Sequence, residues 1–176
     1  MSRSPLAARV ARFDTAVDRA CDRLRSPLLD RIVYPLSSAA DHSILWHGIG
    51  VTRALRNGGD LAGAARFSAA LGIESALTNG PVKMVFGRLR PVDFTEVDFR
   101  YGLRRPVTSS FPSGHATAAF CAATLLGGGA GWYALAAAVA ATRVYVRLHH
   151  ASDVLAGAVL GVVLGAGLRP MVRARP

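Results

Sequence analysis

The sequence contains little cysteine and little lysine, and each scarcity excludes a class of site. Cys21 and Cys121 are the two cysteines in 176 residues, which excludes a disulfide framework and a cysteine-ligated metal site. Lys83 is the single lysine among 21 basic residues, so arginine carries almost all of the positive charge. A continuous apolar run near the N-terminus is also missing, so we expect no secretory signal peptide.

The composition that remains favours a small membrane protein. Apolar residues make up 51% of the chain and the mean hydropathy is +0.30, which is high for a soluble domain. The formal net charge of +10 suits an anionic bilayer surface or a nucleic acid. Because no nucleic-acid-binding motif accompanies the arginines, we expect a lipid bilayer and no nucleic acid as partner. We expect a multi-pass protein of the cell membrane.

The first 36 residues contain two amphipathic stretches. Over 5–24, apolar residues recur every three or four positions with arginines between them, which predicts an amphipathic helix. A second apolar stripe follows Pro27, and we expect Pro35 to bend or end it. We therefore separate an N-terminal region, 1–36, from a helical bundle, 37–176. Two placements of the first helix stay open: it lies on the bilayer, or it packs against the rest of the domain.

The remaining chain predicts an all-α fold, an antiparallel integral membrane bundle of about five core helices. The expected helices cover 43–56, 61–86, 113–127, 131–147 and 151–168. Asn79-Gly80-Pro81 should kink the second, and 43–56 is short for a bilayer core, which needs about 20 residues. Close helix packing is expected at four glycines of the last helix: Gly157, Gly161, Gly165 and Gly167.

Three polar clusters occupy helix ends that an antiparallel bundle places on one face. They are Lys83 with Arg90; Ser113, Gly114 and His115; and Arg143, His149 and Asp153. Polar groups between membrane-grade segments are expensive unless they have a function. Singly, each cluster has a plain structural interpretation, such as a helix cap at Ser113 or an ion pair between Arg143 and Asp153. Their occurrence together on one face favours a single active site.

Five of these residues predict a phosphate-binding site. Lys83, Arg90 and Arg143 would bring three cations to one dianionic group. A helix that opens at Ser113 and Gly114 would offer free backbone N–H groups to phosphate oxygens, and glycine lets the ligand approach the backbone closely. Because these groups can stabilise the charge by themselves, we expect no cofactor and no metal site.

The other three residues predict a nucleophile and an acid–base group. His149 and Asp153 are four residues apart, so on one helix face the carboxylate can take the proton of one imidazole nitrogen. The second nitrogen is then free to attack phosphorus and form a phosphohistidine. His115 can protonate the departing oxygen and later deprotonate water.

The clusters resemble the tripartite signature of the type 2 phosphatidic acid phosphatase superfamily, which shares its site with vanadium-dependent haloperoxidases. The likeness covers about residues 37–168, and its motifs here are Lys83 to Arg90-Pro91, Pro112-Ser113-Gly114-His115, and Arg143 to His149 and Asp153. It implies that His149 is the nucleophile, Asp153 its orienting partner and His115 the acid–base. It also implies that phosphate is bound by Lys83, Arg90, Ser113, Gly114 and Arg143.

Four positions depart from the usual family pattern. Thr142 stands where serine is common, Arg147 where a small residue is usual, and His150-Ala151 where Tyr-Pro often stands. These departures alter the mouth of the site and therefore bear on substrate preference more than on the reaction. The short chain and the stretch 40–46 look most like small bacterial enzymes acting on isoprenoid or glycerolipid phosphates.

The leading hypothesis is a metal-independent membrane phosphatase for a lipid phosphate or diphosphate, of the isoprenoid or phosphatidic acid type. One alternative is a haloperoxidase-like enzyme that holds vanadate in the same pocket. The other is a non-catalytic membrane protein that binds a lipid phosphate without turnover.

Two further expectations concern the membrane. The loop 92–111 alternates apolar and charged residues, so it can lie at the headgroup level and guide a lipid substrate; simple packing onto the protein is the other interpretation.

The orientation in the membrane follows from where the arginines lie. Counted alone, the arginines of 53–66 and 169–175 would place the face opposite the site in the cytoplasm. The N-terminal arginines place the catalytic face there if 43–56 crosses the bilayer once, so orientation stays open.

Overall fold

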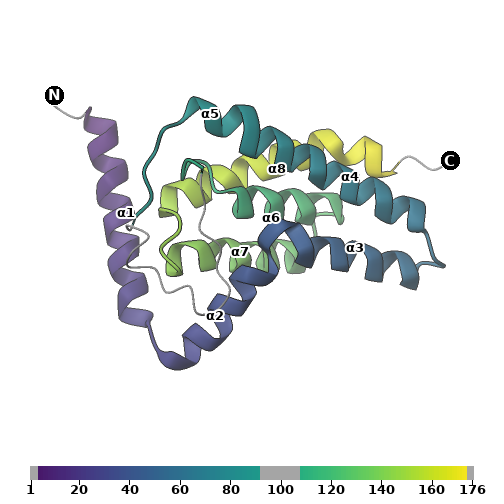
Figure 1. The fold of residues 1–176 in the computed structure, drawn as a ribbon, viewed down its shortest axis with the longest axis horizontal. Coiled ribbons are helices and arrows are strands. Elements are labelled where there is room, and N and C mark those ends of the chain that lie inside the picture. Colours follow the sequence, from purple (N-terminus) through teal and green to yellow (C-terminus); the bar gives the residue numbers. More distant parts are fainter. Residues whose placement is uncertain (1–3, 92–107, 174–176) are drawn as a thin grey trace.

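The computed structural model describes residues 4–91 and 108–173, and every regular element in these two ranges is a helix. In chain order the elements are α1 (Pro5–Leu24), α2 (Pro27–Ala39), η1 (Asp41–Ser43), α3 (Ile44–Arg56), α4 (Leu61–Leu77), η2 (Thr78–Val82), α5 (Lys83–Val85), α6 (Gly114–Leu125), α7 (Ala130–Tyr145) and α8 (Ala151–Arg173). Figure 1 shows α3, α4, α6, α7 and α8 along the long axis, with α1 standing across one end. The all-α bundle with an N-terminal amphipathic helix is confirmed.

The chain changes direction where the sequence contains residues that break helices. Gly80 has non-helical φ and ψ of −91° and −108°, and Pro81 follows it, so the expected kink after α4 is confirmed within η2. The kink leads into α5 and buries Lys83 at the end of the bundle. Pro35 does not end its helix, because α2 continues past this proline to Ala39.

The last helix lies in backbone contact with α6. A Cβ atom added at Gly157 would come within 2.6 Å of the carbonyl oxygen of Ser113, the N-cap of α6. One at Gly161 or Gly165 would come within 2.3 or 2.9 Å of carbonyl oxygens of α6 itself. These three positions are four residues apart and form one face, so only glycine permits this approach. Gly167 has open space around it, so close packing is confirmed at three of the four expected glycines.

Two arginines fix the end of α6 that is remote from the predicted site. Arg53 Nη1 donates to the carbonyl oxygen of Leu126, and Arg169 Nη2 donates to that of Thr124, each at 2.9 Å. Such cations satisfy carbonyl groups that a helix leaves free at its C-terminus. The N-terminus of α6, with its predicted phosphate-binding residues, therefore points to the opposite end of the bundle.

The bundle buries a core of small residues and exposes many large apolar ones. Trp46 and Leu71 are each 1% exposed, and much of the surrounding core is alanine. Large apolar side chains on the outer faces of α3, α4 and α8 are exposed: Ile44, Val51, Leu55, Leu61, Ile73, Leu77, Leu155, Val159, Val162 and Val163. Within the described ranges, α8 is the one helix both long and apolar enough to cross a membrane, with 23 residues and a mean hydropathy of 1.8.

Candidate active site

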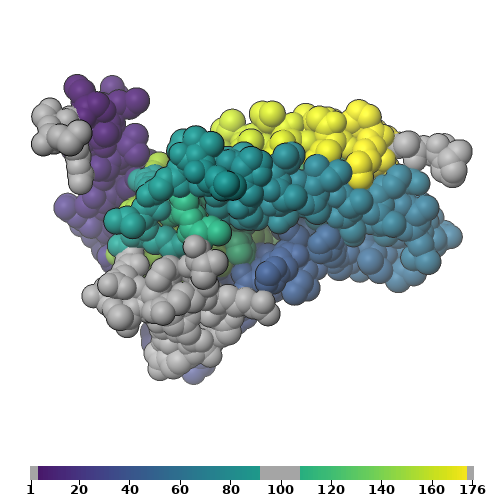
Figure 2. All heavy atoms as spheres, turned by 45° about the horizontal axis from the view of Figure 1, so that its top comes forward, coloured from purple at the N-terminus to yellow at the C-terminus, as the bar shows by residue number. Residues whose placement is uncertain are grey.

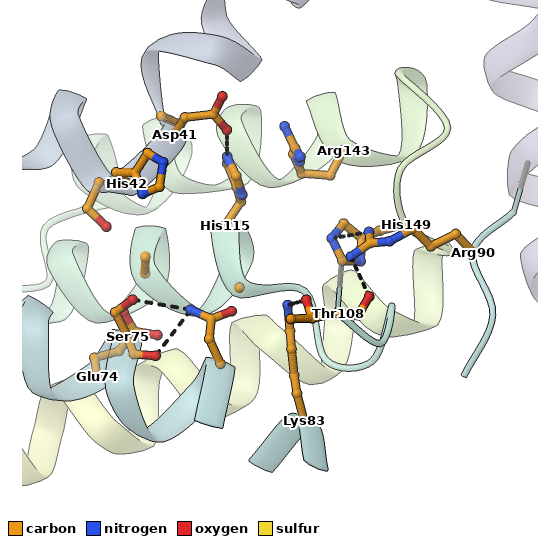
Figure 3. Close-up of a pocket in the computed structure, with 15 residues that line it drawn as sticks. Asp41, His42, Glu74, Ser75, Lys83, Arg90, Thr108, His115, Arg143 and His149 are labelled. Carbon is orange, nitrogen blue, oxygen red and sulfur yellow. Dashed lines mark hydrogen bonds and ion pairs between the residues drawn. The ribbon is translucent and has the colours of Figure 1, made fainter. Parts of the chain in front are cut away.

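A cavity of about 470 Å³ opens at the end of the bundle where α4, α6 and α7 bring their polar ends together. Six predicted site residues line it: Lys83, Arg90, Gly114, His115, Arg143 and His149. Figure 3 shows the side chains of Lys83, Arg90, His115, Arg143 and His149 around one space. Ser113 and Asp153 are buried beside the cavity and do not line it. The one-face grouping inferred from helix ends is thus the arrangement in the folded chain.

The position of His149 defines which of its ring nitrogens can act as a nucleophile. Its Nδ1 atom lies 2.7 Å from the carbonyl oxygen of Ser110, which can only accept, so Nδ1 carries the proton. The lone pair is then on Nε2, which accepts from Arg90 Nη1 at 3.2 Å. Burial, with the cations of Arg90 and Arg143 nearby, lowers the pKa of His149 to about 3 and outweighs the opposing effect of Asp153.

Asp153 does not take the His149 proton in this structure, which differs from the expectation. Its Oδ2 atom is 3.8 Å from His149 Nδ1 and accepts instead from the backbone N–H of His150 at 2.9 Å. Its Oδ1 atom accepts from Arg88 Nη1 at 2.6 Å. The carboxylate therefore stands next to the imidazole as a fixed negative charge, while Ser110 sets the tautomer.

Arg90 approaches the cavity from the segment after α5, held by backbone carbonyls. Its Nη1 donates to the carbonyl of Leu148 at 2.6 Å and its Nη2 to that of Thr108 at 3.1 Å. Burial lowers its pKa to about 10, so the guanidinium stays charged at neutral pH. Its Nε atom is buried and has no hydrogen-bond partner among the residues described, which leaves a donor for an anion.

Arg143 and Lys83 add two further buried cations. Arg143, at the end of α7, donates from Nη1 to the hydroxyl of Ser37 in α2 and keeps a buried, unpartnered Nε. Lys83 Nζ donates to the hydroxyl of Thr108 at 3.3 Å. The ion pair between Arg143 and Asp153, the structural alternative for this cluster, does not form among the described residues, so the Arg143 charge is available to the cavity.

The start of α6 brings backbone groups to the same space. Ser113 caps the helix by accepting from the N–H of Ala116 at 3.4 Å, and the helix begins at Gly114. A Cβ atom at Gly114 would lie 3.0 Å from Asn79 Oδ1 and 3.7 Å from Lys83 Nζ. Glycine therefore keeps the helix end open at the point where the lysine arrives.

His115 has a carboxylate partner that the sequence analysis did not identify. Asp41 Oδ1 lies 2.8 Å from His115 Nε2, as Figure 3 shows. Burial alone would raise the pKa of Asp41, but the hydrogen bond from His115 and the nearby positive charges lower it below the usual value. Two left-handed residues, His42 and Ser43, turn the chain between α2 and α3 and bring Asp41 to the cavity. The one signal in the sequence was the family-like stretch 40–46.

The other side of the cavity is polar but not cationic. Its lining includes Glu74, Ser75 and Asn79 from α4 and η2. Glu74 is 1% exposed; it accepts from the Thr78 hydroxyl through Oε1 and leaves Oε2 without a partner. Hydrogen-bonding groups thus face the cluster of cations across the cavity. The aromatic residues predicted to guide a lipid lie within 92–107, outside the described residues.

The chain resembles known proteins over most of its length. The model of the PAP2 superfamily matches residues 63–176. A Lipid A 1-phosphatase from Porphyromonas gingivalis is 39% identical over 110 residues, which is 56% of this chain and 22% of that protein. The chain therefore spans about a fifth of the length of that curated relative.

Two solved structures share the fold. The transmembrane PAP2 type phosphatidylglycerolphosphate phosphatase from Bacillus subtilis is similar with a TM-score of 0.68 and 24% identity, over 93% of this chain and 85% of that one. Aquifex aeolicus LpxE is similar with a TM-score of 0.60 and 22% identity, over 88% of this chain and 93% of that one. At 24% and 22% identity, these two similarities show a shared helical fold and nothing further.

Proposed function

The chain belongs to the PAP2 superfamily, and from that premise we propose that it is a metal-independent membrane phosphatase that hydrolyses a lipid phosphate or diphosphate through a phosphohistidine. The observation that carries the proposal is the state of His149. Its Nδ1 carries the proton, its Nε2 accepts from Arg90 Nη1 at 3.2 Å, the ring lines the cavity, and the buried Nε atoms of Arg90 and Arg143 have no partner among the described residues. A nucleophile, a set of anion-binding donors and a cavity coincide there.

The first half-reaction transfers the phosphoryl group to His149. The phosphate takes the place of His149 as acceptor for Arg90 and also binds Arg143, Lys83 and the start of α6. Nε2 attacks phosphorus, a P–N bond forms, and the ester P–O bond breaks. His115 gives a proton to the departing oxygen, and the Asp41 carboxylate stabilises the imidazolium that acts as this acid.

The second half-reaction returns the enzyme to its starting state. Neutral His115 accepts a proton from water as the water oxygen attacks phosphorus, the P–N bond breaks, and inorganic phosphate leaves. The buried cations hold the same phosphate oxygens in both steps, so charge stabilisation comes from groups already in place. Figure 3 shows His115 and His149 at the same space, as a shared phosphorus atom requires.

We place the bundle in the cell membrane as a multi-pass protein. Exposed apolar side chains on α3, α4 and α8 support lipid contact, since a water-facing surface of this kind is rarely so extensive. The helices α3 and α6, with 13 and 12 residues, are shorter than the span of about 20 residues that a full bilayer core needs.

The side of the membrane on which the cavity opens is a separate question. Reporter fusions at the C-terminus would decide it.

The deciding experiment compares substrates on the purified full-length protein in mixed micelles. We expect phosphatidic acid or an isoprenyl diphosphate to be hydrolysed with a higher kcat/KM than p-nitrophenyl phosphate, because burial of the lipid tail localises the substrate. Equal efficiency on the soluble ester would refute the lipid-substrate proposal. Phosphate release from none of the three would leave only lipid-phosphate binding.

Two controls separate the chemistry from the alternatives. Rapid alkaline quenching with a ³²P-labelled substrate should trap label on the wild type and none on His149→Ala, because phosphohistidine survives alkali. Vanadate should inhibit phosphate release without supporting bromide oxidation. Bromide oxidation by the vanadate-loaded protein would favour the haloperoxidase alternative.

A further inference from the structure

The helix α1 has an acidic face that turns toward the predicted active site. Asp14, Asp18 and Asp22 are four residues apart, so they share one side of the helix. Asp14 is only 3% exposed, although carboxylates on an amphipathic helix usually face water. Figure 1 shows α1 across the end of the bundle, beside the segment that joins α7 to α8.

Asp14 is buried because it makes three hydrogen bonds to the bundle. Its Oδ1 accepts from the backbone N–H of Ser152 at 2.8 Å, and its Oδ2 accepts from the Ser152 hydroxyl at 2.8 Å. Oδ2 also accepts from Arg88 Nη2 at 2.7 Å. In Figure 2 the purple N-terminal helix lies at one end of the molecule, beside the teal part of the chain.

Arg88 uses its second terminal nitrogen on the carboxylate beside His149. Nη1 lies 2.6 Å from Asp153 Oδ1 and 2.7 Å from the Ser152 hydroxyl. The other Asp153 oxygen accepts from the His150 N–H, so both oxygens are held. The planar guanidinium thus joins two buried carboxylates, one on α1 and one next to the imidazole.

A second arginine ties the same helix to the turn that precedes His149. Arg147 pairs with Asp18 at 3.2 Å and with Asp22. Its backbone has φ of +59°, a left-handed conformation that non-glycine residues adopt uncommonly. Arg147 is one of the departures from the usual family motif, and its partners are acidic residues of this chain's own N-terminal helix.

We infer that α1 is part of the active site's positioning machinery, in which Asp14 orients Arg88 and Arg88 fixes Asp153 against His149. The inference rests on the proposed function. Arg88 does not line the cavity and Asp14 lies still farther out, so both are positioning residues. If they act in this way, their loss lowers kcat and leaves KM unchanged, because the phosphate-binding cations stay in place.

The test measures kcat and KM for Asp14→Asn, Arg88→Gln and the double variant on the lipid phosphate that the wild type hydrolyses. We expect each single change to lower kcat about 10- to 100-fold with KM within twofold, as partners one shell out from a functional group commonly do. The double variant should have about the same kcat as the less active of the two single variants, because each single change already breaks the same chain of contacts. Arg19→Gln is the matched control, since Arg19 is exposed on the same helix.

Arg88→Lys guards against simple misfolding, because it keeps the charge. A lysine ammonium has no planar fork to join Asp14 and Asp153. We expect Arg88→Lys to remain folded and to lose kcat as Arg88→Gln does. Wild-type kcat in Arg88→Lys and in Asp14→Asn would overturn the inference, as would multiplicative losses in the double variant.

A readout without catalysis separates this inference from the proposed function. Cys21 is half-buried where α1 packs on the bundle, and Cys121 is fully buried between helices. Maleimide modification of Cys21 should therefore be faster in Asp14→Asn than in wild type and unchanged in Arg19→Gln. If Cys21 is modified faster in Asp14→Asn but the wild type has no phosphatase activity, the proposed function is refuted and the structural role of Asp14 stands. Unchanged modification and unchanged kcat would refute the role of Asp14.

Discussion

Asp41 Oδ1 and His115 Nε2 lie 2.8 Å apart although 74 residues separate them in the chain. The pair places a carboxylate next to the proposed acid–base, on its Nε2 atom. His149 has no such direct partner, because its Nδ1 donates to a backbone carbonyl. The two histidines of the cavity thus have different hydrogen-bond partners, a carboxylate for His115 and a backbone carbonyl for His149.

Asp41→Asn should impair His115 as a general acid. Loss of the negative charge destabilises the imidazolium, so we expect kcat on an alkyl phosphate to fall about 10- to 100-fold with little change in KM. A p-nitrophenolate leaving group needs little protonation, so the loss on p-nitrophenyl phosphate should be smaller. Steady-state kinetics on both substrates measures the difference.

Asp60→Asn is the control for Asp41→Asn. Asp60 caps α4 at the far end of the bundle, so this change removes one carboxylate without touching the cavity. Equal losses on both leaving groups in Asp41→Asn would contradict its role through His115.

His149→Ala should abolish turnover, and Asp153→Asn should leave residual activity. The first change removes the attacking nitrogen. The second removes a fixed negative charge 3.8 Å from the ring but leaves the Ser110 hydrogen bond that sets the tautomer. Phosphate release, normalised to folded protein in detergent, checks both. Comparable activity of His149→Ala and wild type would eliminate the nucleophile assignment.

His149 should stay unprotonated in the free enzyme from pH 8 down to pH 5. Burial lowers its pKa to about 3, whereas in an unfolded chain it is near 6.5. Protons therefore bind the unfolded state more readily, so this histidine lowers stability as the pH falls from about 6.5 toward 3. Histidine NMR, with the signal assigned by its loss in His149→Ala, would show no titration in that window. A midpoint near 6.5 would contradict the neutral, buried nucleophile.

Chelation should leave activity intact. Guanidinium groups, one ammonium and a helix end supply the proposed charge stabilisation, so no step requires a metal ion. Phosphate release in excess EDTA should equal that in untreated protein. Loss of activity on chelation, followed by recovery with magnesium, would overturn the proposed mechanism.

Gly161→Ala should destabilise the protein and Gly167→Ala should not. A Cβ at Gly161 would lie 2.3 Å from a carbonyl oxygen of α6, and overpacking of this kind costs about 1–3 kcal/mol. At Gly167 the same methyl meets open space, and alanine favours a helix by roughly 0.5–1 kcal/mol. Thermal unfolding in detergent should show a lower Tm for Gly161→Ala alone. Equal Tm values would contradict backbone contact between α6 and α8.

The grouping of the cavity residues was accessible from the sequence because it depends on helix ends. Apolar runs locate the helices, antiparallel packing alternates their ends, and polar clusters at those ends must then share a face. Lys83, Gly114 and His149 lie around one cavity for that reason. The glycines spaced by four similarly indicated the face of α8 that packs most closely.

Side-chain pairs between distant segments were not accessible in the same way. Many acidic residues can pair with a given arginine or histidine, and periodicity does not choose among them. Asp41, Arg88 and Asp14 were therefore missed, and Asp153 was assigned the Nδ1 proton that Ser110 accepts. The spacing of His149 and Asp153 suggests one helix face, but α8 begins only at Ala151, after the histidine. The division at residue 36 stays a prediction, although α1 and the bundle are joined by Arg88.

The glycine contact between α6 and α8 determines which walls of the cavity can accept amino-acid substitutions. Because the two backbones touch, main-chain atoms set the distance between residues 112–115 and the start of α8. We therefore expect few substitutions to be tolerated at Gly157, Gly161 and Gly165. The wall formed by α4 and η2 carries Glu74, Ser75 and Asn79, which are held by side-chain hydrogen bonds, Glu74 to Thr78 and Asn79 to Ser75. A library that varies these three positions is therefore the practical route to altered head-group selectivity with the reaction centre unchanged.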